Sequence, residues 1–150
     1  MAVLKNQGKG RFHGRQEALW TSTSNDDYTS HWIPYLRWGE DRRPPPYHPW
    51  RLEVSPTVRV YEIHGPEAWH TLCLASPLYA PDGAVMPNWE AVAHIWDGVH
   101  LSVGWLLTTE GIRWSTPEGW TQLSGWTLES TVWLRWVFDH MERLPPVTTS

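Results

Sequence analysis

The chain has 150 residues, the length of one ordinary domain, and a chain of this size buries about 70% of its unfolded surface when it folds. Hydrophobic residues make up 41% of the sequence and charged residues 19%, as in an ordinary globular protein. The formal net charge of −4 argues against a domain that holds nucleic acid through nonspecific phosphate contacts, but it is compatible with a local basic groove.

The cellular compartment can be inferred from cysteine usage and hydropathy. Cys73 is the only cysteine, so an internal disulfide is excluded and a reducing compartment is the simpler prediction. No basic and then apolar segment begins the chain, and the longest apolar run, residues 101–107, is far shorter than the roughly 20 residues that cross a bilayer. We therefore expect a cytoplasmic protein without a membrane partner.

The elements are predicted in chain order from periodicity and turn residues. They are strands at 11–15 and 18–24, a helix from Asp26 or Asp27 to 38 that Pro34 kinks or shortens, a strand at 57–63, helices at 66–74 and 87–96, and strands at 99–107, 112–115, 120–123 and 132–138. Residues 97–98 are a predicted turn, 99–107 is the strongest strand, and 132–138 also suits a helix. The pattern predicts an α+β protein with a sheet-rich second half.

The domain organisation follows from composition. Residues 1–10 are polar with two glycines and predict a flexible N-terminus, and residues 144–150 predict a flexible tail. Residues 11–143 are predicted to form a single domain. The proline-rich segment 39–49 is predicted to be a surface loop rather than a boundary, because polyproline cannot continue a helix and only about 40 residues precede it.

Tryptophan is the unusual residue, with 13 copies against two of phenylalanine. A buried tryptophan removes about 150–250 Å² from water and brings one N–H that needs a partner. Trp69, Trp89 and Trp96 fall at helical spacing and are predicted to lie in the core. Trp20 and Trp126 each precede a candidate site segment, so we expect these two rings to line one cleft.

Two segments carry candidate chemistry. The first joins His13-Gly14-Arg15 to the hydroxyls of Ser22-Thr23-Ser24, and the second places Glu129 before two hydroxyls and between aromatic rings. A nucleotide suits such groups, because phosphates accept from arginine and hydroxyl donors, a planar base stacks on tryptophan, and a carboxylate holds a sugar hydroxyl.

These segments resemble a family. The stretches LWTSTS, HWIPYLRW, WDGVHLS and GWTLESTVWLRW are similar to small ADP-ribosyltransferase-like proteins of bacteria and phages, over about residues 11–138. The shared order is His-Gly or Arg on a first strand, Ser-Thr-Ser on a second, and Glu opening a late strand. The resemblance implies one α+β domain with an ADP-ribosyltransferase-like split mixed β-sheet and short flanking helices.

The resemblance also implies roles for individual residues. NAD would be the substrate, Glu129 the catalytic residue that stabilises the oxocarbenium-like transition state, and no metal would take part. The residues implied to contact NAD are His13, Gly14, Arg15, Trp20, Ser22, Thr23, Tyr28 and Trp32. Those implied to contact the acceptor are Trp126 and Thr127, and the charge of Arg43 in the proline-rich loop adds it as a candidate contact to a nucleic-acid acceptor. His13 and Arg15 leave open whether the site is of the His type or the Arg type.

The chain departs from the family at Thr127, where family members commonly have Glu or Gln two residues before the catalytic Glu. The acceptor therefore stays open between nucleic acid and protein, and plain NAD hydrolysis or an inactive fold also stays open. As a transferase, the protein would be a toxin or a phage-encoded modifier of the host.

Other readings compete with the enzyme. A noncatalytic tryptophan-rich module could bind nucleic acid or a protein partner, and Arg42 and Arg43 near Tyr47 and Trp50 would suit a nucleic-acid strand. A carbohydrate-binding module is disfavoured because no secretion signal is visible. Three simpler roles also remain: Glu129 could pair with Arg113 or Arg135, Ser22–Ser24 could be an exposed strand end, and His100 could be a satisfied or surface residue. His64/His70 and His94/His100 are each six apart and predict no metal site.

Overall fold

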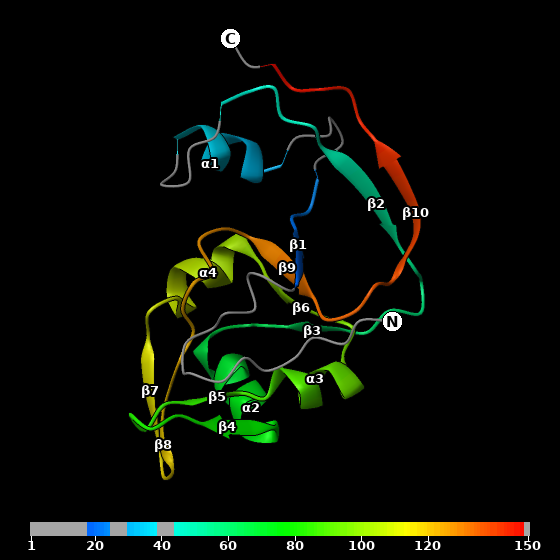
Figure 1. The fold of residues 1–150 in the computed structure, drawn as a ribbon. Coiled ribbons are helices and arrows are strands. Elements are labelled where there is room, and N and C mark those ends of the chain that lie inside the picture. The colour runs from blue at the N-terminus through cyan, green and yellow to red at the C-terminus, as the bar shows by residue number, and fades with distance from the viewer. Residues whose placement is uncertain (1–17, 25–29, 39–43, 149–150) are drawn as a thin grey trace. The chain divides into compact units, whose positions relative to one another are not determined.

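The computed structural model describes residues 18–24, 30–38 and 44–148 (Figure 1). Contacts within the chain divide these residues into two compact units. The larger unit comprises residues 18–21 and 59–136, and the smaller unit comprises the described residues between 22 and 58 together with 137–148. The predicted α+β class is confirmed, since both units combine short helices with strands.

The larger unit is built on a four-stranded sheet in the order β1-β9-β6-β3 (Figure 1). In chain order, its elements are β1 (Leu19–Thr21), β3 (Val60–Glu62), α2 (Pro66–Ala75), β4 (Pro77–Tyr79), β5 (Val85–Pro87), α3 (Trp89–Ile95), β6 (Gly98–Leu101), α4 (Val103–Thr109), β7 (Arg113–Thr116), β8 (Gly119–Gln122) and β9 (Ser130–Trp133). β3 and β6 are parallel, and β9 is antiparallel to both β6 and β1. Parallel strands require a long crossover, which the segment carrying α2 and α3 supplies.

One face of this sheet carries the hydrophobic core. Val99, Leu101 and Val132 belong to one buried cluster with the inward residues of α2 and α3. The cluster also contains Trp69 and Trp89, which confirms the core prediction for these two rings, whereas Trp96 is only partly buried and packs against the cluster. Side chains alternate along a strand, so the residues between these apolar ones point to the opposite face of the sheet.

The predicted helices at 66–74 and 87–96 are confirmed as α2 and α3. Pro66 opens α2, and Asn88 caps α3 by accepting a hydrogen bond from the Ala91 amide at 3.2 Å. The predicted strands at 18–24 and 57–63 correspond to the shorter β1 and β3, and those at 112–115 and 120–123 correspond to β7 and β8, each shifted by one residue. β2, β4 and β5 were not predicted.

The prediction of one strand over residues 99–107 is wrong in its second half. Pairing with β9 ends at Leu101, and Ser102 is extended at the N-cap of α4. The Leu106 amide then donates to the Ser102 carbonyl at 2.9 Å, which is a helical bond. Apolar content alone does not separate a strand from a short helix, so the run 103–107 was misread.

The predictions at 97–98 and 132–138 also need correction. Gly98 opens β6 instead of completing a turn, because it is paired with Val60 of β3 and Trp133 of β9. Glycine suits this position because the Trp133 ring lies over it: a Cβ there would be 2.9 Å from Trp133 Cε3. Segment 132–138 is divided, since β9 ends at Trp133 and the Leu134 amide bonds to the Asp97 carbonyl at 2.9 Å. Phe138 begins β10 in the smaller unit.

The smaller unit contains α1 (Trp32–Trp38) and the antiparallel pair β2 (Trp50–Val54) and β10 (Phe138–Arg143). The helix is shorter than predicted, and Pro34 lies in its first turn, where proline is tolerated. The predicted strand at 11–15 and the predicted cap at Asp26 or Asp27 lie outside the described residues.

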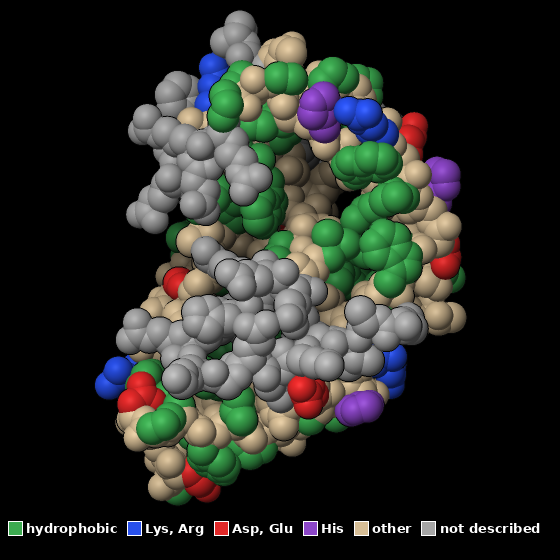
Figure 2. Space-filling view, viewed as in Figure 1, with side chains coloured by type: hydrophobic (Ala, Val, Ile, Leu, Met, Phe, Trp, Pro, Cys, Tyr) green, Lys and Arg blue, Asp and Glu red, His purple; other side chains and the backbone are tan. Residues whose placement is uncertain are grey.

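On the face of the larger unit that is visible in Figure 2, acidic and basic side chains are interspersed with hydrophobic ones. In the described part of the chain, no helix is long and apolar enough to cross a bilayer.

Gly119, at the start of β8, lies against the backbone of Gly83 between β4 and β5. Its backbone has φ of +154°, and an added Cβ would collide with the carbonyl oxygen of Gly83, which accepts a hydrogen bond from the Trp120 amide at 3.0 Å. We expect Gly119→Ala to lower the free energy of unfolding by about 2–4 kcal/mol.

The matched control is Gly104→Ala in α4, where an added Cβ meets nothing within 4 Å. This change should leave stability unchanged or raise it by up to about 1 kcal/mol, because alanine is the better helix former. Urea denaturation of both variants measures the difference, and equal stabilities would contradict the packing described here.

Candidate functional site

A row of polar residues crosses the sheet on the face opposite the core. In the strand register, Thr21 is aligned with Thr131, Thr131 with His100, and His100 with Glu62. Residues directly opposite one another on paired strands point to the same side, so these four side chains share one face. The row therefore brings together residues from β1, β9, β6 and β3.

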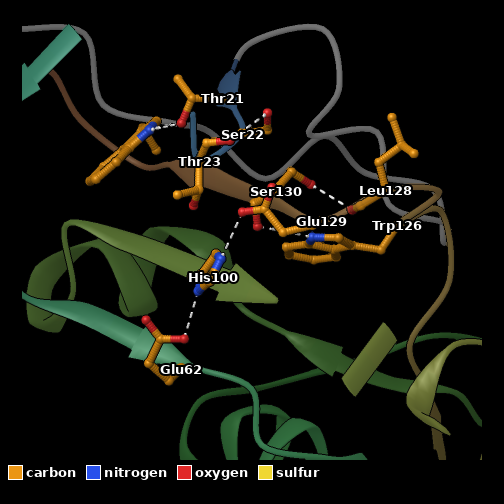
Figure 3. Close-up of polar contacts among 10 residues, drawn as sticks. Thr21, Ser22, Thr23, Glu62, His100, Trp126, Leu128, Glu129 and Ser130 are labelled. Atoms are coloured by element: carbon orange, nitrogen blue, oxygen red, sulfur yellow. Dashed lines mark hydrogen bonds and ion pairs between the residues drawn. The ribbon is translucent and has the colours of Figure 1, made fainter. Parts of the chain in front are cut away.

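Glu129 joins this row from the residue before β9. His100 Nε2 lies 3.0 Å from Glu129 Oε1, and His100 Nδ1 lies 2.7 Å from Glu62 Oε2. Figure 3 shows the imidazole between the two carboxylates, with one ring nitrogen directed at each. The three side chains form a continuous chain of short polar contacts across the sheet.

Solvent exposure rises along this series of three side chains. The Glu129 side chain is 7% exposed, that of His100 18% and that of Glu62 45%. A carboxylate as buried as Glu129 needs hydrogen-bond donors and an opposite charge, because leaving it unpaired costs several kcal/mol. His100 can supply both, while Glu62 connects the chain to solvent.

The positions of the two carboxylates bear on the protonation state of His100. A neutral imidazole carries one N–H, whereas two carboxylates facing both nitrogens ask for two donors. The hydrogen bond to Glu129 raises the pKa of His100 above its ordinary value, and the hydrogen bond to Glu62 acts in the same direction against the opposing effect of burial. The site therefore favours an imidazolium between two carboxylates.

Trp126 anchors the segment that presents Glu129. Its indole N–H donates to the Ser130 carbonyl at 3.3 Å, and Ser130 Oγ donates to the Leu128 carbonyl at 3.1 Å (Figure 3). The Gly125 backbone at the start of this segment has φ of +85°. Held at both ends, the loop delivers Glu129 to β9 in a fixed position.

A hydroxyl and an indole lie at the other end of the row. Trp133 Nε1 donates to Thr21 Oγ1 at 2.8 Å, so β1 and β9 are joined by side chains as well as by their ladder. Thr131 lies between Thr21 and His100 in the register. The face thus combines hydroxyls, two carboxylates and an imidazole.

Among the predicted site residues, Trp20 and Trp126 do lie together. Their ring centroids are 4.9 Å apart with an interplanar angle of 69°. Trp126 is, however, only 1% exposed and also contacts Trp69. The expected cleft between the rings is therefore replaced by direct edge-to-face packing in the core, because a tryptophan this large gains most by complete burial.

The other predicted residues are placed as follows. Thr127 is exposed in the loop before Glu129. Ser22 and Thr23 come directly after β1 and belong to the smaller unit. Trp32 also belongs to the smaller unit, where it opens α1 and its ring contacts Tyr35. His13, Gly14, Arg15, Tyr28 and Arg43 lie outside the described residues.

The simpler roles considered for Glu129 were pairing with Arg113 or Arg135. Arg135 instead pairs with Asp97 at 3.1 Å, and the Arg113 guanidinium lies 3.8 Å from the centroid of the Trp120 ring. Sequence reasoning missed His100 and Glu62 as partners of Glu129. The sequence does contain a signal for His100, because it lies between the apolar residues Val99 and Leu101 on a strand. Alternation along the strand then predicts that its side chain points away from the core.

Within the described residues, no group of three His, Cys, Asp or Glu side chains is arranged to hold a metal ion. Comparison of the chain with protein-family models, with curated proteins and with solved structures gives no match.

The His100 cluster predicts a pH-dependent stability. A folded-state pKa above the unfolded value of about 6.5 contributes stability that is fully present below pH 6.5 and is lost as pH rises through the folded pKa. His100→Gln should therefore destabilise the protein more at pH 6 than at pH 9. Urea denaturation at both pH values measures this.

The control is His94→Gln, which removes an exposed histidine from the end of α3. A destabilisation by His100→Gln that does not depend on pH would show that the imidazolium does not contribute to the fold.

Proposed function

We propose that the protein cleaves the bond between nicotinamide and ribose in NAD and transfers ADP-ribose to a macromolecular acceptor, nucleic acid or protein. The observation that carries the proposal is the Glu129 carboxylate, held at the opening of β9 by His100 on the polar face of the sheet. An ADP-ribosyltransferase-like sheet is part of this proposal.

The carboxylate suits the chemistry. As neutral nicotinamide leaves, positive charge builds on the anomeric carbon and the ring oxygen of ribose. A carboxylate already fixed in place stabilises that charge without having to reorganise, and it does so more strongly where water is largely excluded. Glu129 meets both conditions, since its side chain is buried and hydrogen-bonded.

The strand pairing also supports the proposal. β1 leads into the Ser22-Thr23-Ser24 sequence and pairs with β9, the strand that Glu129 opens. In the family that the chain resembles, the hydroxyls of such a sequence shape the nicotinamide pocket. The biological role proposed with it is that of a toxin or a phage-encoded modifier of the host.

Thr127 bears on the acceptor. It is exposed two residues before Glu129 and supplies a hydroxyl where a second acid or amide would activate the acceptor. The acceptor's own nucleophile, or water, must then attack without a carboxylate from this position. NAD hydrolysis therefore belongs among the activities to be measured.

A noncatalytic tryptophan-rich binding module is the second candidate. The exposed rings of Trp105 and Trp136 in the larger unit, and of Trp50 in the smaller unit, favour it. Exposed tryptophans are common at binding surfaces, where one end of the ring is apolar and the other is wet.

The test is release of free nicotinamide from NAD, with and without nucleic-acid and protein acceptors. We expect Glu129→Gln to lower kcat by about 10²- to 10³-fold, the usual loss on removing one group that stabilises transition-state charge. Glu118→Gln, which removes an exposed carboxylate from the turn between β7 and β8, should leave the rate unchanged.

Circular dichroism and thermal melting verify that both variants are folded. Equal rates for wild type and Glu129→Gln would exclude Glu129 from the mechanism. No release under any condition, together with binding of an acceptor, would favour the binding module.

A further inference from the structure

We propose that His100 is the positioning residue of this site: as an imidazolium bridging Glu62 and Glu129, it holds the Glu129 carboxylate ionised and oriented toward the NAD ribose. This inference rests on the proposed function, and it assigns a regulation by pH to the same site.

The bridge is built from three separate strands. Glu62 comes from β3, His100 from β6, and Glu129 from the residue before β9. Glu62 and His100 are aligned in the parallel register, so their contact is set by the backbone ladder. His100 lies on β6, which is paired with β3 on one side and β9 on the other, so its position is already fixed by the backbone. It therefore loses little further freedom when it orients the Glu129 carboxylate.

The charged groups around Glu129 and His100 indicate the role of each residue. Glu129 is buried and needs a cation, and His100 reaches it at 3.0 Å. Arg59 and Arg135 are both engaged by Asp97 elsewhere in the larger unit. Glu62 and Glu129 are the charged groups that face the imidazole and favour its protonated form.

Glu62 supports the bridge from the solvent side. Its carboxylate accepts from Nδ1 of His100 at 2.7 Å, which fixes the ring orientation and stabilises the second proton. Without Glu62, His100 would lose its proton at lower pH. The neutral ring then has one N–H, which cannot be donated to both carboxylates.

A pH dependence of turnover follows. On the alkaline side, the rate should fall as His100 loses its proton. Glu62→Gln keeps the size of the side chain but removes its charge, so it should move this alkaline limb to lower pH. A purely structural role of Glu62 would lower the amount of folded protein without moving the limb.

His100→Gln separates donation from charge. The amide can still donate one hydrogen bond, but it cannot bridge two carboxylates as a cation. We expect kcat to fall by about 10- to 100-fold, the usual loss when the support of an active group is removed, with a smaller change in KM. The alkaline limb that depends on His100 should disappear.

The experiment is nicotinamide release from NAD between pH 5.5 and pH 9.5, which is from about one unit below to about three units above the unfolded histidine pKa of about 6.5, for wild type and these two variants. Glu118→Gln is the charge-matched control. A limb that moves down in Glu62→Gln but not in Glu118→Gln supports the proposal. An unmoved limb in Glu62→Gln, or full activity in His100→Gln, overturns it.

A second measurement does not depend on NAD. ¹⁵N NMR of the His100 ring should show both nitrogens protonated at pH 6 in the wild type, and deprotonation at lower pH in Glu62→Gln than in the wild type. If nicotinamide is never released while the ring behaves in this way, the proposed function fails and the bridge stands. A ring that loses its proton at the same pH in the wild type and in Glu62→Gln overturns the bridge itself.

Discussion

The structure of the polar face depends on one constraint, which is that a buried carboxylate must be paired. The Glu129 side chain is 7% exposed, and His100 meets it at 3.0 Å. Removing one partner from such a pair leaves a buried charge without compensation, which costs about 3–5 kcal/mol. The pairing therefore requires β6 to lie beside the opening of β9, which the antiparallel ladder between these strands provides.

The core holds this arrangement from the other side of the sheet. Val99 and Leu101 flank His100 and are completely buried, so the imidazole must point away from the core. Trp126 is buried three residues before Glu129 and ties its loop to Ser130. Tryptophan thus contributes to the site indirectly. Its large, rigid rings hold the backbone in place from the core side of the sheet. The smaller polar side chains on the opposite face are then available for chemistry.

Local patterns predicted the parts of this structure that local forces determine. Pro66 and the helical spacing of Trp69 predicted α2, whereas the strand expected at 132–138 begins at Ser130, directly after Glu129, and ends at Trp133. The contact between His100 and Glu62 could not be predicted, because these residues are 38 positions apart and meet through a parallel pairing whose register is not encoded in either strand alone. The helix at 103–109 was missed because a short apolar run fits both periods.

The most direct test of the account is a double-mutant cycle on the free energy of unfolding, with His100→Leu, Glu129→Gln and the double variant. Leucine removes both N–H groups, and glutamine keeps the shape of residue 129 without its charge. The account predicts a coupling energy of about 1 kcal/mol or more at pH 6, which becomes smaller at pH 9. Effects that add to within about 0.3 kcal/mol at both pH values would contradict a direct pairing of His100 with Glu129.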